Sequence, residues 1–176
     1  MDKRNGAILL LCAASVMLLV SLITKGWYRG EKHGIKSGIN MWGMVENCPK
    51  GASKKHCLGS TLKLSDLRKG SEKAWLVFGK AGMIVGAISA ILLLVLSGLL
   101  GGRNPATKPT AIAALIGVSL TTVCALLFLI LKPDGVPGIG YSVYLFFPSA
   151  VAGIAASRMA IKALDYLAEP DHNPIA

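Results

Sequence analysis

The sequence predicts an all-α membrane protein, built as a bundle of four transmembrane helices with one large loop. The first observation is composition, since 53% of the 176 residues are hydrophobic and 16% are charged, against about 45–50% and about 25% in soluble domains. The second is that the apolar residues fall into four blocks, at 7–23, 75–100, 110–131 and 141–164. Each block has close to the roughly 20 residues that cross the hydrocarbon core as a helix.

The first block, 7–23, follows the short basic start MDKRNG and has the outline of a secretory signal peptide. No A-x-A-like cleavage site follows it, because the run ends in LITKGW. We therefore expect this block to be retained as the first membrane span.

The connections between the blocks differ greatly in length. Segment 24–74, between the first two blocks, is the single large loop. Segments 101–109 and 132–140 are short and rich in glycine and proline, as turns should be. With a short tail at 165–176, residues 1–176 are expected to form one four-span domain with both termini on the same side of the membrane.

Ionisable residues lie near the ends of the blocks. Lys80 is five residues past Trp75, so its side chain is expected to reach the outer interface. Arg158 and Lys162 are four residues apart near the inner end of the last block, where they suit an anionic leaflet. We therefore predict no proton relay, voltage sensor or transport site.

Two signals disagree on which side of the membrane the large loop lies. It holds eleven Lys and Arg against four acidic residues, a net charge of +7, and such residues usually mark cytoplasmic loops. Cys48 and Cys57 are its only cysteines, and a disulfide between them implies an oxidising compartment. Because the charge rule weakens in longer loops, we expect the loop outside the cell, both termini in the cytoplasm, and the plasma membrane as the location.

Two alternatives to the disulfide remain open from the residues alone. The first is a pair of reduced thiols in a cytosolic loop. The second is a metal site formed by His33, Cys48, His56 and Cys57, which is disfavoured because adjacent His56 and Cys57 break the usual zinc-ligand spacing. The other two cysteines, Cys12 and Cys124, lie within the blocks and are expected to pack there.

Several motif residues resemble one family of four-span proteins. Trp27 follows the first block, Asn40, Met41 and Trp42 lie in mid-loop, and eight residues separate Cys48 from Cys57. The last block begins GIGYSVYLFFPSAVAG. Together with the topology, these features resemble the claudin and peripheral-myelin-protein-22-like superfamily. The resemblance implies that the loop folds as a small antiparallel β-sheet on top of the helix bundle, held by the Cys48–Cys57 disulfide.

The aromatic residues of the loop are expected to have two roles. The Trp42 ring is expected to cover the disulfide as part of the small core of the sheet, or to lie at the membrane surface. Trp27, Tyr28 and Trp75 flank the loop, and we expect them to anchor it at the membrane–water interface, where Trp and Tyr are enriched.

Small residues recur one helical turn apart in three of the blocks. They are Gly82, Gly86 and Ala90; Ala113 and Gly117; and Ser149, Gly153 and Ser157. Such rows let helix backbones approach closely in lipid. We expect them either to pack this bundle internally or to bind a partner subunit, and the pattern does not separate the two.

The sequence contains no recognisable catalytic motif. There is no H-E-x-x-H, no nucleophile elbow and no phosphate-binding glycine loop. We therefore predict a protein that is not an enzyme, with no cofactor, no metal and no nucleic-acid partner. The resemblance implies an accessory subunit of a larger membrane complex, which we favour because the end NPIA lacks the motif by which claudins bind scaffold domains. The alternative is a cell–cell adhesion or paracellular barrier protein.

The basic residues of the loop bear on both functions. They include Lys50, Lys54, Lys55, Lys63, Arg68, Lys69 and Lys73. Along a paracellular path they favour anions, and against a partner they require an acidic surface; a third interpretation is that they only solvate the loop and touch lipid headgroups. The expected partners are membrane lipids and either other membrane-protein subunits or further copies of this chain.

Overall fold

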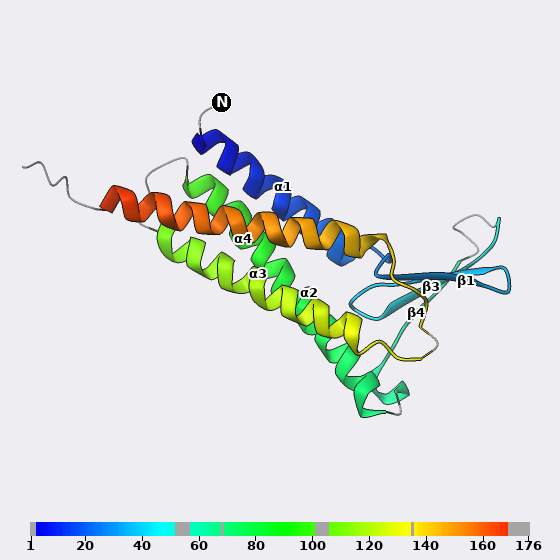
Figure 1. Ribbon diagram of the computed structural model, residues 1–176. Helices are drawn as coiled ribbons and strands as arrows, with labels where there is room; N and C mark the ends of the chain where they lie inside the picture. Colours follow the sequence, from blue (N-terminus) through cyan, green and yellow to red (C-terminus); the bar gives the residue numbers. More distant parts are fainter. Residues whose placement is uncertain (1–2, 52–56, 68, 101–105, 135, 169–176) are drawn as a thin grey trace, which may run out of the picture.

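The computed structural model is a bundle of four long helices with a small sheet at one end (Figure 1). It describes residues 3–51, 57–67, 69–100, 106–134 and 136–168, and the account below is confined to these residues. The helices are α1 (Lys3–Ile23), α2 (Gly70–Leu99), α3 (Thr107–Ile130) and α4 (Tyr141–Ala168). The strands are β1 (Tyr28–Lys32), β2 (Ile35–Ile39), β3 (Met44–Pro49) and β4 (Leu58–Thr61).

The helices form a closed ring of neighbours. Helix α1 packs against α2 and α4, and α3 packs against the same two helices. The start of α1 and the end of α4 lie at one end of the bundle, the terminal end, and the sheet lies at the other, the sheet end (Figure 1). The prediction of four long helices packed as a bundle is thereby confirmed. Each helix contains a segment long and apolar enough to cross a membrane: Asn5–Ile23, Gly70–Leu99, Thr107–Ile130 and Tyr141–Lys162.

Helix α2 begins earlier than the hydropathy pattern predicts, at Gly70 instead of residue 75. The Glu72 carboxylate accepts a hydrogen bond from the Lys69 backbone N–H at 3.3 Å, which satisfies one free donor before the first turn. The first turn of α2 is therefore polar and extends beyond the apolar block.

The rows of small residues lie mostly inside the bundle. A Cβ added to Gly86 would lie 2.7 Å from Leu22 Cδ1 of α1 and 2.9 Å from Thr121 Cγ2 of α3. The buried members are Gly82, Gly86, Ala90, Ser149, Gly153 and Ser157; Gly117 is half-buried and Ala113 is exposed. Seven of the eight residues therefore support packing between the helices of this bundle.

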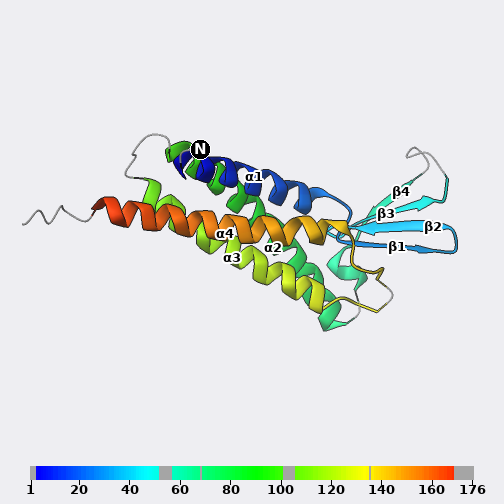
Figure 2. The same cartoon turned by 45° about the horizontal axis from the view of Figure 1, so that its top comes forward.

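The sheet has four antiparallel strands in the order β1-β2-β3-β4 (Figure 2). His33 and Gly34 connect β1 to β2 with φ values of 51° and 72°, the left-handed pair that a two-residue hairpin turn requires. The α3–α4 connection covers the outer edge of β1, because the Arg29 N–H donates to the Gly138 carbonyl at 2.8 Å and the Gly140 N–H donates to the Trp27 carbonyl at 2.9 Å. The outer edge of β1 is thus hydrogen-bonded to the α3–α4 connection.

The turn between β2 and β3 rests directly on α2. Asn40 shapes this turn, since its side-chain carbonyl accepts the Met44 N–H at 2.9 Å. A Cβ added to Gly79 of α2 would overlap the Met41 carbonyl oxygen and lie 2.7 Å from Phe128 Cε2. Glycine at position 79 is therefore what lets the turn and α3 both approach α2.

We predict that Gly79→Ala lowers the thermal unfolding midpoint of the purified protein. The new methyl group meets a backbone carbonyl and an aromatic ring, and overpacking of this kind costs about 1–3 kcal/mol. Gly98→Ala is the matched control, because Gly98 lies in the same helix with no atom within 4 Å of its added Cβ. That control should be neutral or stabilising by up to about 1 kcal/mol, and equal midpoints for the two variants would contradict the close contact at Gly79.

Candidate binding groove at the sheet end

Five buried aromatic residues join the sheet to the bundle, and they form what we call the aromatic cluster. They are Trp27, Tyr28, Trp75, Phe128 and Phe146. Trp75 of α2 stacks on Phe128 of α3 with ring centroids 5.0 Å apart and planes 8° apart. Tyr28 of β1 lies against both rings, with centroids at 6.0 and 5.2 Å. One strand and two helices are thereby fixed to each other.

The polar atoms of these rings are satisfied inside the protein. Trp27 Nε1–H donates to the Ser21 carbonyl at 2.6 Å, and the Tyr28 hydroxyl donates to the Phe128 carbonyl at 2.5 Å. Trp75 Nε1–H donates to the Tyr28 hydroxyl oxygen at 3.4 Å. The expectation that Trp27, Tyr28 and Trp75 anchor the loop at a membrane interface is therefore wrong. Their rings are no more than 1% exposed, because each polar atom finds its partner in the core.

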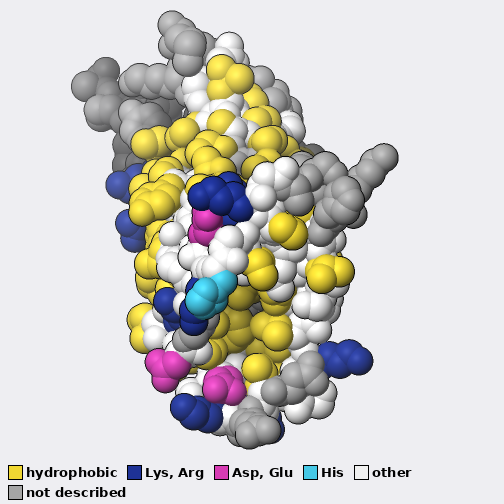
Figure 3. Space-filling model, turned by 90° about the vertical axis from the view of Figure 1, so that its right-hand side faces the viewer, with side chains coloured by type: hydrophobic (Ala, Val, Ile, Leu, Met, Phe, Trp, Pro, Cys, Tyr) yellow, Lys and Arg dark blue, Asp and Glu magenta, His cyan; other side chains and the backbone are white. Residues whose placement is uncertain are grey.

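Successive side chains of each strand point to opposite faces of the sheet. Ser37, Ile39, Val45 and Asn47 face a groove of about 720 Å³, whose other walls are the start of α2 and the α3–α4 connection. Figure 3 shows apolar side chains gathered in a hollow at this end of the molecule, with charged side chains around it. We call this hollow the sheet groove.

The lining of the sheet groove combines an apolar base with acidic groups. Its apolar part includes Ile39, Val45, Trp75 and Val136. Glu72 and Asp134 bring two carboxylates to it, and among the described residues Lys32 is the one basic residue that lines it. Glu31 also borders the groove, but it pairs with Lys36 in the sheet, so its carboxylate lies on the opposite face, where it holds the Lys50 ammonium at 3.1 Å. The lining of the groove is thus acidic, although segment 24–74 as a whole carries a net positive charge.

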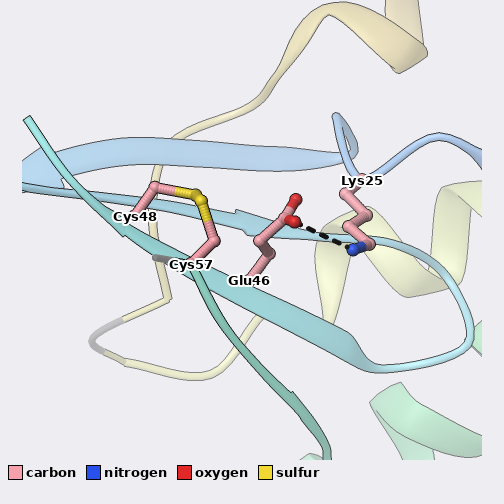
Figure 4. Close-up of polar contacts among 4 residues, drawn as sticks. All are labelled: Lys25, Glu46, Cys48 and Cys57. Carbon is pink, nitrogen blue, oxygen red and sulfur yellow. Dashed lines mark ion pairs between the residues drawn. A yellow bond between two sulfur atoms is a disulfide. The ribbon is translucent and has the colours of Figure 1, made fainter. Parts of the chain in front are cut away.

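The predicted disulfide between Cys48 and Cys57 is confirmed, and it lies on the face of the sheet opposite the groove. Figure 4 shows it beside Glu46, whose carboxylate holds the Lys25 ammonium at 3.2 Å. The alternatives of reduced thiols and of a metal site are both contradicted. The Glu46 carboxylate lies within 4.8 Å of both sulfurs, but sulfurs joined to each other are not the thiolates that bind a metal.

Trp42 does not take the first of the two positions that we expected for it, over the disulfide. It lies in the β2–β3 turn, at the end of β3 away from Cys48, and is 36% exposed. The Lys80 ammonium lies over its ring, 5.6 Å from the centroid. The neighbouring Met41 is fully buried instead, because the turn directs it onto Gly79 and Gly82 of α2. The expectation that Trp42 belongs to the core of the sheet and covers the disulfide is therefore wrong.

The basic residues singled out from the sequence lie away from the groove lining. Lys50, Lys63, Lys69 and Lys73 are exposed and none of them lines the groove. Lys54, Lys55, Arg68 and His56 lie outside the described residues. The sequence did not indicate the groove itself, because the walls of the groove come from three segments that are distant along the chain. Only the Gly- and Pro-rich composition of segment 132–140 indicated a defined connection there.

No protein-family model matches this chain, and no curated protein matches it. The resemblance to the claudin-like superfamily therefore stays a prediction, carried by the motif residues and the topology.

The aromatic cluster makes stability sensitive to alkaline pH. Burial raises the pKa of the Tyr28 phenol from 10.0 to about 12, although the hydrogen bond from Trp75 acts the other way. As the pH rises from 10 to 12, the unfolded chain loses this proton while the folded chain keeps it, so the unfolded state binds fewer protons. The free energy of unfolding should therefore fall over this range, by up to about 3 kcal/mol.

Denaturant unfolding at several pH values above 9 tests this prediction. Tyr28→Phe should flatten the fall relative to the unchanged protein, whatever its cost at neutral pH from the unpaired Phe128 carbonyl. Tyr144→Phe is the control, because Tyr144 is 73% exposed, and it should keep the full fall. Parallel curves for all three proteins would contradict a shifted Tyr28.

Proposed function

We propose that this chain is an integral membrane protein whose four helices span the bilayer. The outward faces of the helices support this proposal, because they carry large apolar side chains and few charges. Ile84, Ile88, Ile91 and Val95 follow one another along α2, and each is between 47 and 57% exposed. Apolar surface of this extent is stable only in lipid or against another protein.

Within the membrane, we propose that the chain is an accessory subunit of a larger complex and binds its partner at the sheet groove. The observation that carries this proposal is an acidic, partly apolar groove with firmly held walls. Trp75, from the aromatic cluster, is part of one wall. Another wall is the α3–α4 connection, which is hydrogen-bonded to β1 at Arg29. A preformed site of this kind loses little conformational entropy on binding.

The lining indicates the chemistry of the partner segment. Ile39, Val45 and Val136 offer apolar contact, and Glu72 and Asp134 offer negative charge. A partner segment with a basic side chain next to apolar ones fits this pairing. The rows of small residues also favour the groove as the partner site. Most of these residues are buried between the helices of this bundle, so they are not accessible to a helix of a second protein.

Adhesion between cells, or a paracellular barrier, is the second candidate function. Exposed lysines favour it: Lys36, Lys63, Lys69 and Lys73 lie on the sheet or next to it, and all four are exposed. Basic groups of this kind attract anions or an acidic surface on a facing cell. In this case further copies of the chain, and no foreign subunit, would be the main partners.

We predict that the sheet lies outside the cell and that both termini lie in the cytoplasm. A membrane-impermeant maleimide should label Cys48 and Cys57 in intact cells only after mild reduction, because their sulfurs are joined. The label should be absent from the double variant Cys48→Ser/Cys57→Ser. Labelling that requires permeabilised cells would place the sheet in the cytoplasm and would contradict the proposed orientation.

We further predict that a foreign membrane subunit co-purifies with this chain in mild detergent, and that blocking the sheet groove releases it. Ser37→Tyr places a ring in the groove, and Lys36→Tyr places the same ring on the opposite face of the same strand. The first variant should reduce recovery of the subunit at least roughly tenfold, the change that a loss of about 1.4 kcal/mol produces. The second should leave recovery unchanged.

The comparison of these two variants separates the candidate functions. Loss in both variants would mean that the strand, and not the groove, is needed. Recovery of further copies of this chain without any foreign subunit would favour adhesion or a barrier. The thermal midpoints of both variants are measured alongside, because Ser37→Tyr also removes the hydrogen bond that Ser37 donates to the Asn47 side-chain carbonyl at 2.7 Å.

A further inference from the structure

A second groove opens on the side of the bundle, between α3 and α4, and we call it the lateral groove. Its volume is about 800 Å³. Leu115 of α3 forms one side, and Val151, Ile154 and Met159 of α4 contribute to the other. This groove lies along the apolar part of the helices, far from the sheet groove.

Two basic side chains lie at one end of the lateral groove. Arg158 and Lys162 both line it, both are exposed, and they are one helical turn apart on α4, so they share a face of the helix. They lie toward the terminal end of the bundle, which the proposed topology puts in the cytoplasm. Among the described residues, no carboxylate lines this groove and none forms an ion pair with either side chain.

We propose that the lateral groove binds one anionic phospholipid of the cytoplasmic leaflet. The phosphate lies between the guanidinium of Arg158 and the ammonium of Lys162, and one acyl chain lies along Val151 and Ile154. This proposal rests on the proposed function in two respects: the helices span a membrane, and the terminal end of the bundle lies in the cytoplasm. It adds a defined lipid site to that function.

The two halves of the groove together select a lipid over other ligands. Arginine binds phosphate through paired, charge-assisted hydrogen bonds, and basic pockets between membrane helices on the cytoplasmic side suit anionic headgroups. A free phosphate would use only the cationic end and leave the apolar wall uncovered. A neutral helix of another protein would leave the charges of Arg158 and Lys162 without partners. An acyl chain that ends in an anionic headgroup satisfies both halves.

The test is lipid retention by the full chain, measured by native mass spectrometry. The protein is purified in mild detergent and given phosphatidylglycerol or phosphatidylcholine with identical acyl chains. We expect one phosphatidylglycerol to be retained per chain, with a preference over phosphatidylcholine of roughly tenfold or more, as the two charge-assisted contacts predict. No preference between the two lipids would overturn the proposal.

Three variants assign the retention to this groove. The double variant Arg158→Gln/Lys162→Gln should abolish the preference. Ala155→Phe keeps both charges but fills the groove that Ala155 lines, and it should weaken retention as well. Lys108→Gln is the matched control, because Lys108 lies in the first turn of α3 at the same end of the bundle and does not line the groove.

Each remaining outcome has a definite meaning. Equal losses in Lys108→Gln and in the double variant would show general attraction to basic side chains and would overturn the proposal, as would full retention by Ala155→Phe. Competition by glycerol 3-phosphate as strong as that by the lipid would show an anion site without a place for an acyl chain, and would overturn the proposal. Failure of the chain to remain in membranes after an alkaline wash would overturn the proposed function too, whereas a chain that remains but retains no lipid overturns only this inference.

Discussion

The stacked contact between Trp75 and Phe128, with the Tyr28 hydroxyl hydrogen-bonded to both residues, is the constraint on which the rest of the structure depends. It joins β1, α2 and α3 at one point, and Tyr28 donates to a carbonyl at the end of α3. A four-stranded sheet this small has little core of its own, because its strands are only four to six residues long. The sheet therefore takes its position, and much of its stability, from the end of the bundle.

That position gives the two faces of the sheet different environments. The face toward α2 and the α3–α4 connection encloses the sheet groove, with Asp134 and Glu72 at its walls. The opposite face carries the Cys48–Cys57 disulfide and the Lys25–Glu46 ion pair (Figure 4). The disulfide joins β3 to the residue before β4, and the ion pair joins β3 to the residues before β1. Both lie away from the groove, so they restrain the sheet without occupying the surface proposed for a partner.

The sequence predicted the helices and the disulfide correctly because each leaves a local signal, a long apolar block or an isolated pair of cysteines. The burial of Trp27, Tyr28 and Trp75 left no such signal, since a tryptophan at the end of an apolar block fits an interface and a core equally well. Which it occupies depends on partners such as Ser21 and Phe128. The acidic groove was hidden for the same reason, because Glu72 and Asp134 come together only in the folded chain.

Burial of the small residues decides what the bundle can offer to its surroundings. Gly82, Gly86 and Gly153 sit between helices, so the outward faces are left with bulky side chains such as Ile84 and Ile88, which suit fluid acyl chains better than a tightly packed helix. Specific binding of a ligand or partner is therefore expected where a groove interrupts this apolar surface. Among the described residues, the two grooves defined above each combine a hollow with charge: an acidic one at the sheet end and a basic one beside α4. Their opposite charges, at opposite ends of one bundle, favour different ligands, a basic protein segment at the first and an anionic headgroup at the second.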